Sequence, residues 1–290
     1  FIKKLNEVVF EYYPDALMIA EESTDWPFVT WPTSSNGLGC NYKWNMGWMN
    51  DTLKYVQLDF SRRKQEHRLL TFSLVYAFSE KFILPFSHDE VVHEKKSLIE
   101  KMPGDYWQKF SGLRVLFLYY FCHPGKKLAF MGSEFAQFIE WKYDSALDWQ
   151  ILDFDMHRKF KEYVKSLNYL YLGQKAMWEN DFNWDGFEWI DANDNEQSIL
   201  IFIRKAVRKI NYLVVIINFS VDGYENFKIG IPEKVNYKEI FNTDSINFGG
   251  SGKTNSGTLV CEKELCHKRE YSIKIKIPPL GGVILKPCAE

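Results

Sequence analysis

Residues 82–93 read Phe-Ile-Leu-Pro-Phe-Ser-His-Asp-Glu-Val-Val-His, a short apolar run that polar and charged side chains follow directly. The arrangement recurs at residues 16–20, followed by Glu-Glu-Ser-Thr at 21–24, and at residues 127–131, followed by Gly-Ser-Glu at 132–134. Continuous apolar runs separated by helix-like stretches are typical of parallel strands that are covered on both faces. Parallel α/β folds bind ligands at the carboxyl ends of their strands. The three segments therefore predict a carboxylate-lined site.

Helix-like stretches separate these apolar runs. Residues 1–13 carry apolar side chains at helical spacing, residues 44–58 form a second helix-like stretch, and residues 106–121 predict a long amphipathic helix. A fourth apolar run, at residues 72–76, predicts another strand. Together these elements predict an α/β region that covers residues 1–172.

The pattern changes after residue 173. The runs at residues 198–203, 212–217 and 271–277 are rich in β-branched side chains, and the last of them alternates apolar and polar residues. Turn-forming Gly, Asn and Asp residues separate the runs. These features are typical of antiparallel strands. Residues 173–290 therefore predict an all-β domain, either a sandwich or a small barrel.

The overall composition argues against several classes of protein. The 290 residues carry 36 basic and 38 acidic side chains, and 46% of them are hydrophobic. This balance argues against nucleic acid or an anionic membrane as the main partner, because both select for clustered Lys and Arg. No apolar run approaches the length of a membrane span. The five cysteines form no CxxC pair and are typical of free thiols in a reducing cytosol, so we expect a soluble, cytoplasmic protein.

A carboxylate-lined site has two common uses. One is catalysis at a glycosidic bond, which needs a general acid and a nearby negative charge that stabilises the oxocarbenium-like transition state. The other is binding of a divalent metal, for which His88, Asp89, Glu90 and His93 supply possible ligands. The spacing of the two histidines matches no HExxH zinc motif. We therefore expect no metal.

Tryptophan side chains crowd the α/β region, and most of them are expected in the core, because large aromatic side chains dominate core energetics. Trp26, Trp31 and Trp141 differ, because they lie in polar loops that follow predicted strands. An exposed aromatic ring in such a loop stacks well on the apolar face of a sugar. These three residues are the candidate substrate-binding aromatics.

Several motifs resemble those of the 1,4-alpha-glucan (glycogen) branching enzymes of the α-amylase superfamily, and they extend over essentially the whole chain. They are Met-Ile-Ala-Glu-Glu-Ser-Thr at 18–24, Leu-Pro-Phe-Ser-His-Asp-Glu-Val-Val-His at 84–93, Lys-Met-Pro-Gly-Asp at 101–105, Phe-Met-Gly-Ser-Glu-Phe-Ala-Gln at 130–137, Glu-Trp at 140–141, Leu-Asp-Trp at 147–149, Asn-Thr-Asp-Ser at 242–245 and Pro-Pro-Leu at 278–280. The resemblance implies an enzyme of glycogen biosynthesis. It would cleave an α-1,4 bond in glycogen or an amylose-like α-glucan, transfer the released chain to a glucose 6-hydroxyl, and need no cofactor.

The resemblance also implies a fold and a role for individual residues. The apolar runs would be strands five to eight of an eight-stranded (β/α)8 barrel. Glu21, after strand five, matches the family's general acid/base, and Asp89, after strand seven, matches the carboxylate that stabilises the transition state. His88 matches a ligand of the substrate's hydroxyl groups. Glu21 would first donate a proton to the leaving sugar and then accept one from the acceptor hydroxyl.

One element of the family's site has no counterpart here. Retention of configuration requires a carboxylate nucleophile about 5–5.5 Å from the acid, and no segment of this chain matches the family's nucleophile segment. A complete barrel takes about 250 residues, whereas the predicted α/β region covers residues 1–172. We therefore expect the C-terminal half of the enzyme, which lacks the N-terminal half as its partner and is inactive and poorly stable alone, because a half barrel exposes its strand edges.

Two other functions stay open at this point. One is an amylase-superfamily hydrolase, which shares the residues at the strand ends but transfers the glucan to water. The other is a non-catalytic fragment that binds α-glucan without cleaving it, because it holds the acid and the stabilising carboxylate but no nucleophile. Counting new branch points and new reducing ends on amylose separates these possibilities.

Overall fold

A parallel sheet of four strands occupies the first part of the chain in the computed structural model, which describes residues 1–288. Its strands follow one another in sequence order and all neighbours are parallel. They are β1 (Ile19–Ala20), β2 (Tyr42–Trp44), β3 (Phe82–Phe86) and β4 (Lys126–Ala129). Every residue of β3 is buried, as a continuous apolar run predicts for a central parallel strand. The strands that we predicted in residues 16–20, 82–86 and 127–131 are thus confirmed.

The strand that we predicted at residues 72–76 is wrong. This segment is helical: α3 (Arg68–Thr71) continues into the 3-10 helix η3 (Phe72–Val75). The burial explains why, because Leu70, Ser73, Leu74 and Ala77 are buried and Val75 is exposed, which is the three-and-four spacing of a helix face. The missing strand is β2, whose short sequence Tyr-Lys-Trp carries no apolar run.

Four longer α-helices and several short helical turns complete the fold. The α-helices are α1 (Ile2–Tyr12), α2 (Met46–Val56), α4 (Tyr106–Cys122) and α5 (Asp155–Gly173). The other 3-10 helices are η1 (Thr33–Ser35), η2 (Phe60–Glu66), η4 (His88–Val91), η5 (Ser133–Phe135), η6 (Trp149–Asp153), η7 (Lys175–Met177), η8 (Trp184–Gly186) and η9 (Ile246–Phe248). The helices expected in residues 1–13, 44–58 and 106–121 are confirmed. No helix within residues 1–288 is both long and apolar enough to span a membrane.

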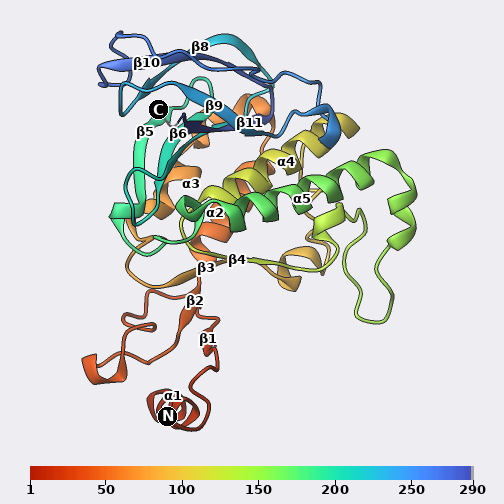
Figure 1. Cartoon of the computed structure of the whole chain (residues 1–290). Helices are drawn as coiled ribbons and strands as arrows, with labels where there is room; N and C mark the ends of the chain where they lie inside the picture. The colour runs from red at the N-terminus through yellow and green to blue at the C-terminus, as the bar shows by residue number, and fades with distance from the viewer. Residues whose placement is uncertain (289–290) are drawn as a thin grey trace.

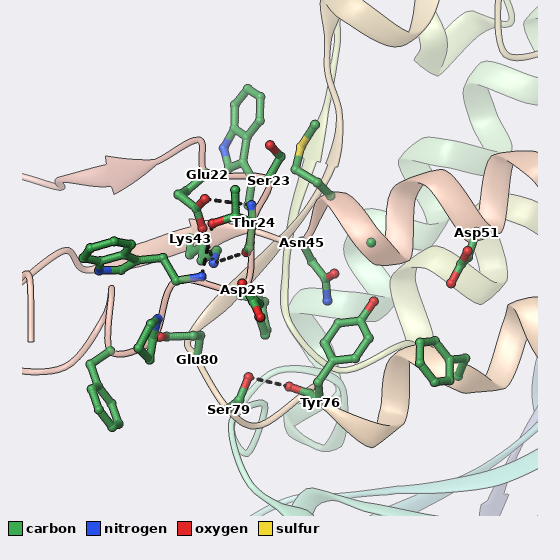
Figure 2. Close-up of a pocket in the computed structure, with 18 residues that line it drawn as sticks. Glu22, Ser23, Thr24, Asp25, Lys43, Asn45, Asp51, Tyr76, Ser79 and Glu80 are labelled. Carbon is green, nitrogen blue, oxygen red and sulfur yellow. Dashed lines mark hydrogen bonds and ion pairs between the residues drawn. The ribbon is translucent and has the colours of Figure 1, made fainter.

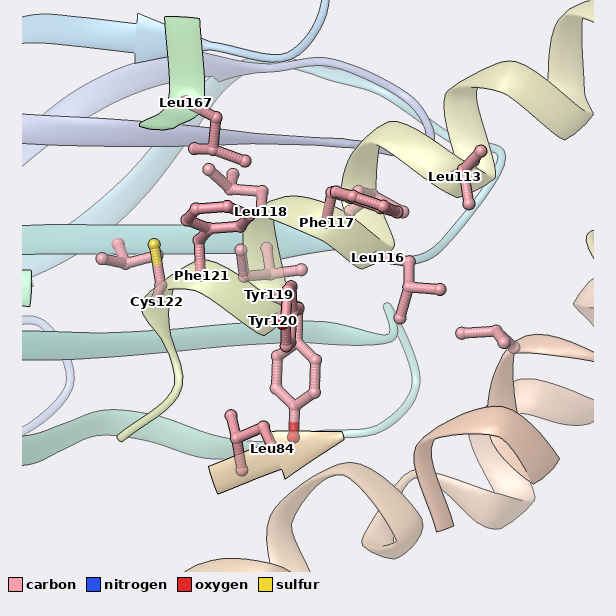
Figure 3. Close-up of a cluster of buried hydrophobic side chains, with 14 of the residues drawn as sticks. Leu84, Leu113, Leu116, Phe117, Leu118, Tyr119, Tyr120, Phe121, Cys122 and Leu167 are labelled. Carbon is pink, nitrogen blue, oxygen red and sulfur yellow. The ribbon is translucent and has the colours of Figure 1, made fainter. Parts of the chain in front are cut away.

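Helix α4 is present where we predicted it, but it is not amphipathic. Residues 110–122 are all buried, because α4 lies between the parallel sheet and an antiparallel sheet (Figure 1). On one side the ring of Tyr120 lies 5.0 Å from that of Phe86 in β3. On the other side α4 contacts two antiparallel strands, and Leu118 and Phe121 are part of this core (Figure 3). A helix with sheets on both sides has no polar face.

Two antiparallel sheets follow α5. The five-stranded sheet has the order β5 (Phe187–Asp194), β6 (Ile199–Lys205), β7 (Tyr212–Asn218), β11 (Gly281–Pro287) and β9 (Tyr237–Asn242). The two-stranded sheet pairs β10 (Tyr271–Ile277) with β8 (Tyr224–Ile231). The two sheets enclose a second core that includes Ile201 of β6 and Ile275 of β10. The antiparallel all-β region that we predicted is confirmed.

Strand β6 shows why strands of the five-stranded antiparallel sheet can be continuous apolar runs in the sequence. Ile199, Ile201 and Ile203 belong to the core between the two antiparallel sheets. Leu200 and Phe202 belong to the main core, which also contains α4 and α5. Both faces of the sheet are therefore covered, and neither needs polar side chains. Because the main core includes side chains from both predicted regions, the division at residue 172 stays a prediction.

A buried ionic network joins the two regions. Arg204 in β6 is fully buried and donates to Asp181 (Nη2 to Oδ1, 2.6 Å) and to the Cys122 carbonyl oxygen (2.7 Å). Lys126 at the start of β4 donates to the other oxygen of Asp181 at 3.0 Å. One carboxylate thus pairs with two cations from different sheets. This fixes β4 relative to the antiparallel sheet.

Candidate active site

His88 and Asp89 lie in η4, directly after β3. Ser87 caps this turn: its hydroxyl oxygen accepts from the Asp89 amide at 3.3 Å, and its own amide donates to Glu90 Oε2 at 2.5 Å. The turn buries Glu90 and leaves the side chains of His88 and Asp89 half exposed, at 48% and 46%. His88 Nε2 lies 3.2 Å from Asp89 Oδ1. The cap thus presents an imidazole and a carboxylate side by side at the carboxyl end of β3.

Trp141 lies beside His88, although more than fifty residues separate them in sequence. The two ring centroids are 6.2 Å apart in an edge-on arrangement, and the Phe130 ring lies 5.1 Å from that of Trp141. The Trp141 amide donates to the Val91 carbonyl oxygen at 3.0 Å. The loop after β4 is therefore tied to the loop after β3, and it brings a predicted aromatic residue to the predicted His-Asp pair.

The two glutamates after β1 have different surroundings. Glu22 pairs with the buried Lys43 of β2 (2.5 Å) and accepts from the Thr24 amide (2.7 Å). Desolvation raises the pKa of Glu22, but these hydrogen bonds outweigh it, so the pKa lies below its usual value. Lys43 also donates to the Thr24 carbonyl oxygen at 3.0 Å. Glu22 therefore anchors the loop, whereas Glu21 is exposed at the end of the strand.

A pocket of about 550 Å³ lies between this loop, the β2–α2 junction and the α3–η3 segment (Figure 2). The backbone at Gly47 lies close to the Tyr76 side chain: a Cβ atom at position 47 would lie 2.4 Å from the Tyr76 hydroxyl oxygen. The lining combines aromatic rings with short polar side chains. It includes Glu22, Ser23, Thr24, Asp25, Trp26, Phe28, Trp44, Asn45, Asp51, Phe72, Tyr76, Ser79 and Glu80.

Asn45 is the most buried polar residue of this pocket. Its Oδ1 caps α2 by accepting from the Trp48 amide at 2.9 Å, and its Nδ2 has no hydrogen-bond partner. The amide group points into the pocket (Figure 2). Burial raises the pKa of Asp51, and burial together with Asp51 raises the pKa of Tyr76 to about 12. The Asn45 amide and the Tyr76 hydroxyl are uncharged donors beside aromatic faces, which suits a ligand that combines hydroxyl groups with apolar faces.

Trp26 and Trp31 lie away from Trp141. Trp26 is 60% exposed and lines the large pocket. Trp31 packs edge-on against Phe28 (5.0 Å) and lines a separate depression. Glu80 holds the intervening loop by accepting from the Val29 and Thr30 amides, both at 2.8 Å. The three predicted aromatic residues therefore occupy three different places, and only Trp141 adjoins His88.

Comparisons with known proteins find a matching family and several similar enzymes. Residues 189–288 match the family described as the alpha amylase C-terminal all-beta domain. Over 287 residues, or 99% of its length, the chain is 57% identical to the 1,4-alpha-glucan branching enzyme GlgB of Halothermothrix orenii and 55% identical to that of Desulfitobacterium hafniense. The chain is closely similar to 1,4-alpha-glucan branching enzymes. It spans about half of these relatives, 46% and 45% of their lengths.

Solved structures of glucan-processing enzymes are similar to this chain in fold. A pullulanase from Paenibacillus barengoltzii aligns with a TM-score of 0.68 at 14% identity, covering 99% of this chain and 45% of that one. An α-amylase from H. orenii aligns with a TM-score of 0.59 at 12% identity, covering 99% and 56%. At such identities the likeness concerns the fold alone, which this chain shares with parts of an α-amylase and a pullulanase.

The structure adds residues that sequence reasoning missed. Asn45 and Tyr76 line the pocket, and Lys101 and Glu140 contact the loop that follows Asp89. Asn45 had a recognisable signal, because it precedes a helix at the end of a strand, where an Asn often caps. Glu140 and Lys101 lie in two of the motifs that carry the family resemblance, but no role was assigned to them, because their partners are backbone groups. Within the part of the chain that the structure describes, no group of three or more His, Cys, Asp or Glu side chains is placed to hold a metal ion.

Proposed function

We propose that this chain is part of a 1,4-alpha-glucan branching enzyme and supplies its general acid/base and its stabilising carboxylate. The observation that carries the proposal is the 57% identity over nearly the whole chain to a branching enzyme. In support, Glu21 follows β1 and the His88–Asp89 pair follows β3, so both lie at carboxyl ends of strands of one parallel sheet, with β2 between the two strands. Such folds bind their ligands at these ends.

The parallel sheet is, in this proposal, strands five to eight of a (β/α)8 barrel, and the all-β domain begins after residue 172. Two features support this view. The strand order is sequential and every neighbour is parallel, as in a barrel. Strand β1 lies at an edge of the sheet, and apolar side chains of α1 next to it are exposed, such as Leu5 and Val8. The remaining strands and the nucleophile belong to the part of the relatives that this chain does not span.

The proposed mechanism has two displacements. In the first, the nucleophile attacks C1 of the donor glucose while Glu21 protonates the departing glycosidic oxygen, which leaves a covalent glycosyl-enzyme. In the second, Glu21 takes the proton of an acceptor 6-hydroxyl, whose oxygen attacks C1 and releases the nucleophile. The Asp89 carboxylate stabilises the positive charge that develops at C1 in both transition states. His88 binds a substrate hydroxyl next to it.

The aromatic residues bind the α-glucan in this proposal. Trp141 covers one side of His88, and the pocket around Trp26 offers aromatic faces beside hydrogen-bonding groups. Transfer exceeds hydrolysis only if the acceptor sugar is positioned while water is excluded. Aromatic side chains around the site favour that outcome, because they bind a sugar face and displace water.

A chimeric protein tests the proposal. In it the 290 residues replace the matching segment of the Halothermothrix orenii enzyme. We expect the chimera to introduce branch points into amylose. Glu21→Gln should lower the rate by about 10²–10⁴-fold and leave glucan binding nearly unchanged, because the amide is neutral and similar in shape. Glu7→Gln on the exposed side of α1 is the matched control. Branching by the Glu21→Gln variant at the normal rate would remove Glu21 from the acid/base role.

The same assay separates the alternative functions. New reducing ends without new branch points would identify a hydrolase. A folded chimera that binds glucan but forms neither product would identify a binding fragment.

A further inference from the structure

The backbone that follows Asp89 adopts a costly conformation. His93, Glu94 and Lys96 have φ angles of 56°, 65° and 68°, in the left-handed region that side chains other than glycine rarely occupy. We call residues 93–96 the 93–96 loop. Such backbone persists only where surrounding contacts hold it, and it is typical of functional sites.

The 93–96 loop is not packed against other side chains on every side. A cavity of about 550 Å³ lies between the 93–96 loop and α2, and Glu94, Lys95, Lys96 and Lys101 line it. All residues of the loop are exposed. The loop therefore has space to move, and specific polar contacts must hold its shape.

Two charged side chains provide them. The Glu140 carboxylate accepts from the Glu94 amide (3.0 Å) and from the Lys96 amide (2.6 Å). The Lys101 ammonium group donates to the Lys95 and Lys96 carbonyl oxygens, the latter at 2.9 Å. The peptide unit between residues 95 and 96 is thus bound at both ends. Its N–H donates to an anion and its C=O accepts from a cation, and hydrogen bonds to ions are about twice as strong as neutral ones.

The charge of Lys101 is in place at neutral pH. Lys101 is buried, and burial lowers its pKa to about 8 while Glu140 and Glu90 oppose the shift and Lys95 and Lys96 add to it. Lys101 therefore keeps most of its charge at pH 7.

The clamped loop contacts Asp89 directly, and one of the two clamping residues lies next to the ring that adjoins His88. Lys95 donates from its ammonium group to the Asp89 carbonyl oxygen at 2.9 Å. Glu140 directly precedes Trp141, whose ring adjoins His88. A shift of the 93–96 loop therefore moves the backbone of Asp89, and a shift of Glu140 moves the ring beside His88.

We propose that Glu140 and Lys101 are positioning residues that clamp the 93–96 loop from opposite ends of one peptide unit and thereby set the positions of Asp89 and His88. Neither side chain touches the reacting atoms in this account. The inference rests on the proposed function, because it assigns the clamp to the site where Asp89 would act.

The decisive variant is Glu140→Gln. A glutamine oxygen satisfies one of the two amides, while its NH2 group faces the other donor, so the size is kept and the clamp is lost. Lys101→Met is the second variant, and it removes the ammonium group that donates to the two carbonyl oxygens of the loop. Asp144→Asn is the matched control, because Asp144 is an exposed acid in the same loop as Glu140.

The first readout is hydrogen exchange in the 290-residue chain and in the chimera. We expect the amides of Glu94 and Lys96 to exchange at least tenfold faster in Glu140→Gln, with the amides of α4 unchanged. Asp144→Asn should exchange like the unaltered chain. Unchanged exchange at both amides in both clamp variants would overturn the proposal.

The second readout is the kinetics of the chimera. Glu140→Gln and Lys101→Met should each lower kcat by about 10-fold or more with KM changed less than threefold, because the substrate still binds while Asp89 is misplaced. A change in exchange with kcat unaltered would reduce the clamp to a structural role and overturn the proposal. A chimera that lacks branching altogether would count against the proposed function, whereas the exchange readout would still report on the clamp.

Discussion

Helix α1 and strand β6 both carry apolar side chains at regular spacing, but only those of β6 are buried. Ile199, Ile201 and Ile203 are fully buried between the two antiparallel sheets. Leu5 and Val8 are 39% and 37% exposed, and α1 lies at the far end of the molecule from those sheets (Figure 1).

Helix α1 buries a polar side chain and exposes apolar ones, which is the reverse of the usual arrangement in a helix. Its buried residue is Asn6, which donates to the Leu38 carbonyl oxygen at 2.8 Å, while its apolar stripe faces outward. Spacing in a sequence therefore shows which side chains form a stripe, and only a partner surface decides whether the stripe is buried. The five-stranded antiparallel sheet has such partners on both sides, whereas the first strands of the parallel sheet do not.

The largest expected effect tests the joint between the two regions. Arg204→Ala leaves the buried Asp181 with only Lys126, and removing one partner of a buried ion pair costs about 3–5 kcal/mol of unfolding free energy. Urea unfolding of the chain measures this loss. The exposed Arg208→Ala is the control and should change stability by less than about 0.5 kcal/mol. Equal effects of the two variants would mean that the network contributes little.

A pair of leucine variants tests the comparison directly. Leu118→Ala creates a cavity in the fully buried face of α4 and should cost about 2–5 kcal/mol. Leu5→Ala in α1 removes a partly exposed side chain and should cost less than about 1 kcal/mol. Urea unfolding of both variants gives the two values. A similar loss from Leu5→Ala would contradict the view that the α1 stripe is uncovered in this chain.

The sequence predicted three of the four parallel strands and the position of α4, because apolar runs and helical spacing are local properties. It missed β2, since Tyr-Lys-Trp has no apolar run and is held by neighbours on both sides. It misjudged residues 72–76, because a short apolar run fits a buried helix as well as a strand.

The candidate site shows a similar division. The sequence located His88, Asp89 and Trp141, and the structure brings these three together. It placed Glu140 and Lys101 in family motifs but gave them no role, because their partners are backbone groups of the 93–96 loop, which become neighbours only after folding.

The smallest expected effect concerns His123, which is buried where α4 meets the parallel sheet. Its Nδ1 lies 2.9 Å from the Pro124 carbonyl oxygen and its Nε2 lies 3.0 Å from the Ser73 hydroxyl oxygen, which suits a neutral ring. Burial, together with the charges of Lys127 and Arg204, lowers its pKa to about 3. An unfolded chain binds this proton at about pH 6.5. Stability from this residue is therefore complete above pH 6.5 and is lost as the pH falls toward 3.

Two histidine variants isolate that contribution. As the pH falls from 7 to 5, proton binding by His123 in the unfolded chain should lower the unfolding free energy by about 2 kcal/mol. The loss is about 1.4 kcal/mol per pH unit below 6.5. His123→Gln keeps one donor and one acceptor and should remove this part of the slope. His93→Gln, at an exposed position, should leave the slope unchanged. If unfolding free energy depended on pH equally steeply in the chain and in His123→Gln, water would reach this ring. The end of α4 would then belong to the uncovered part of the molecule, together with α1.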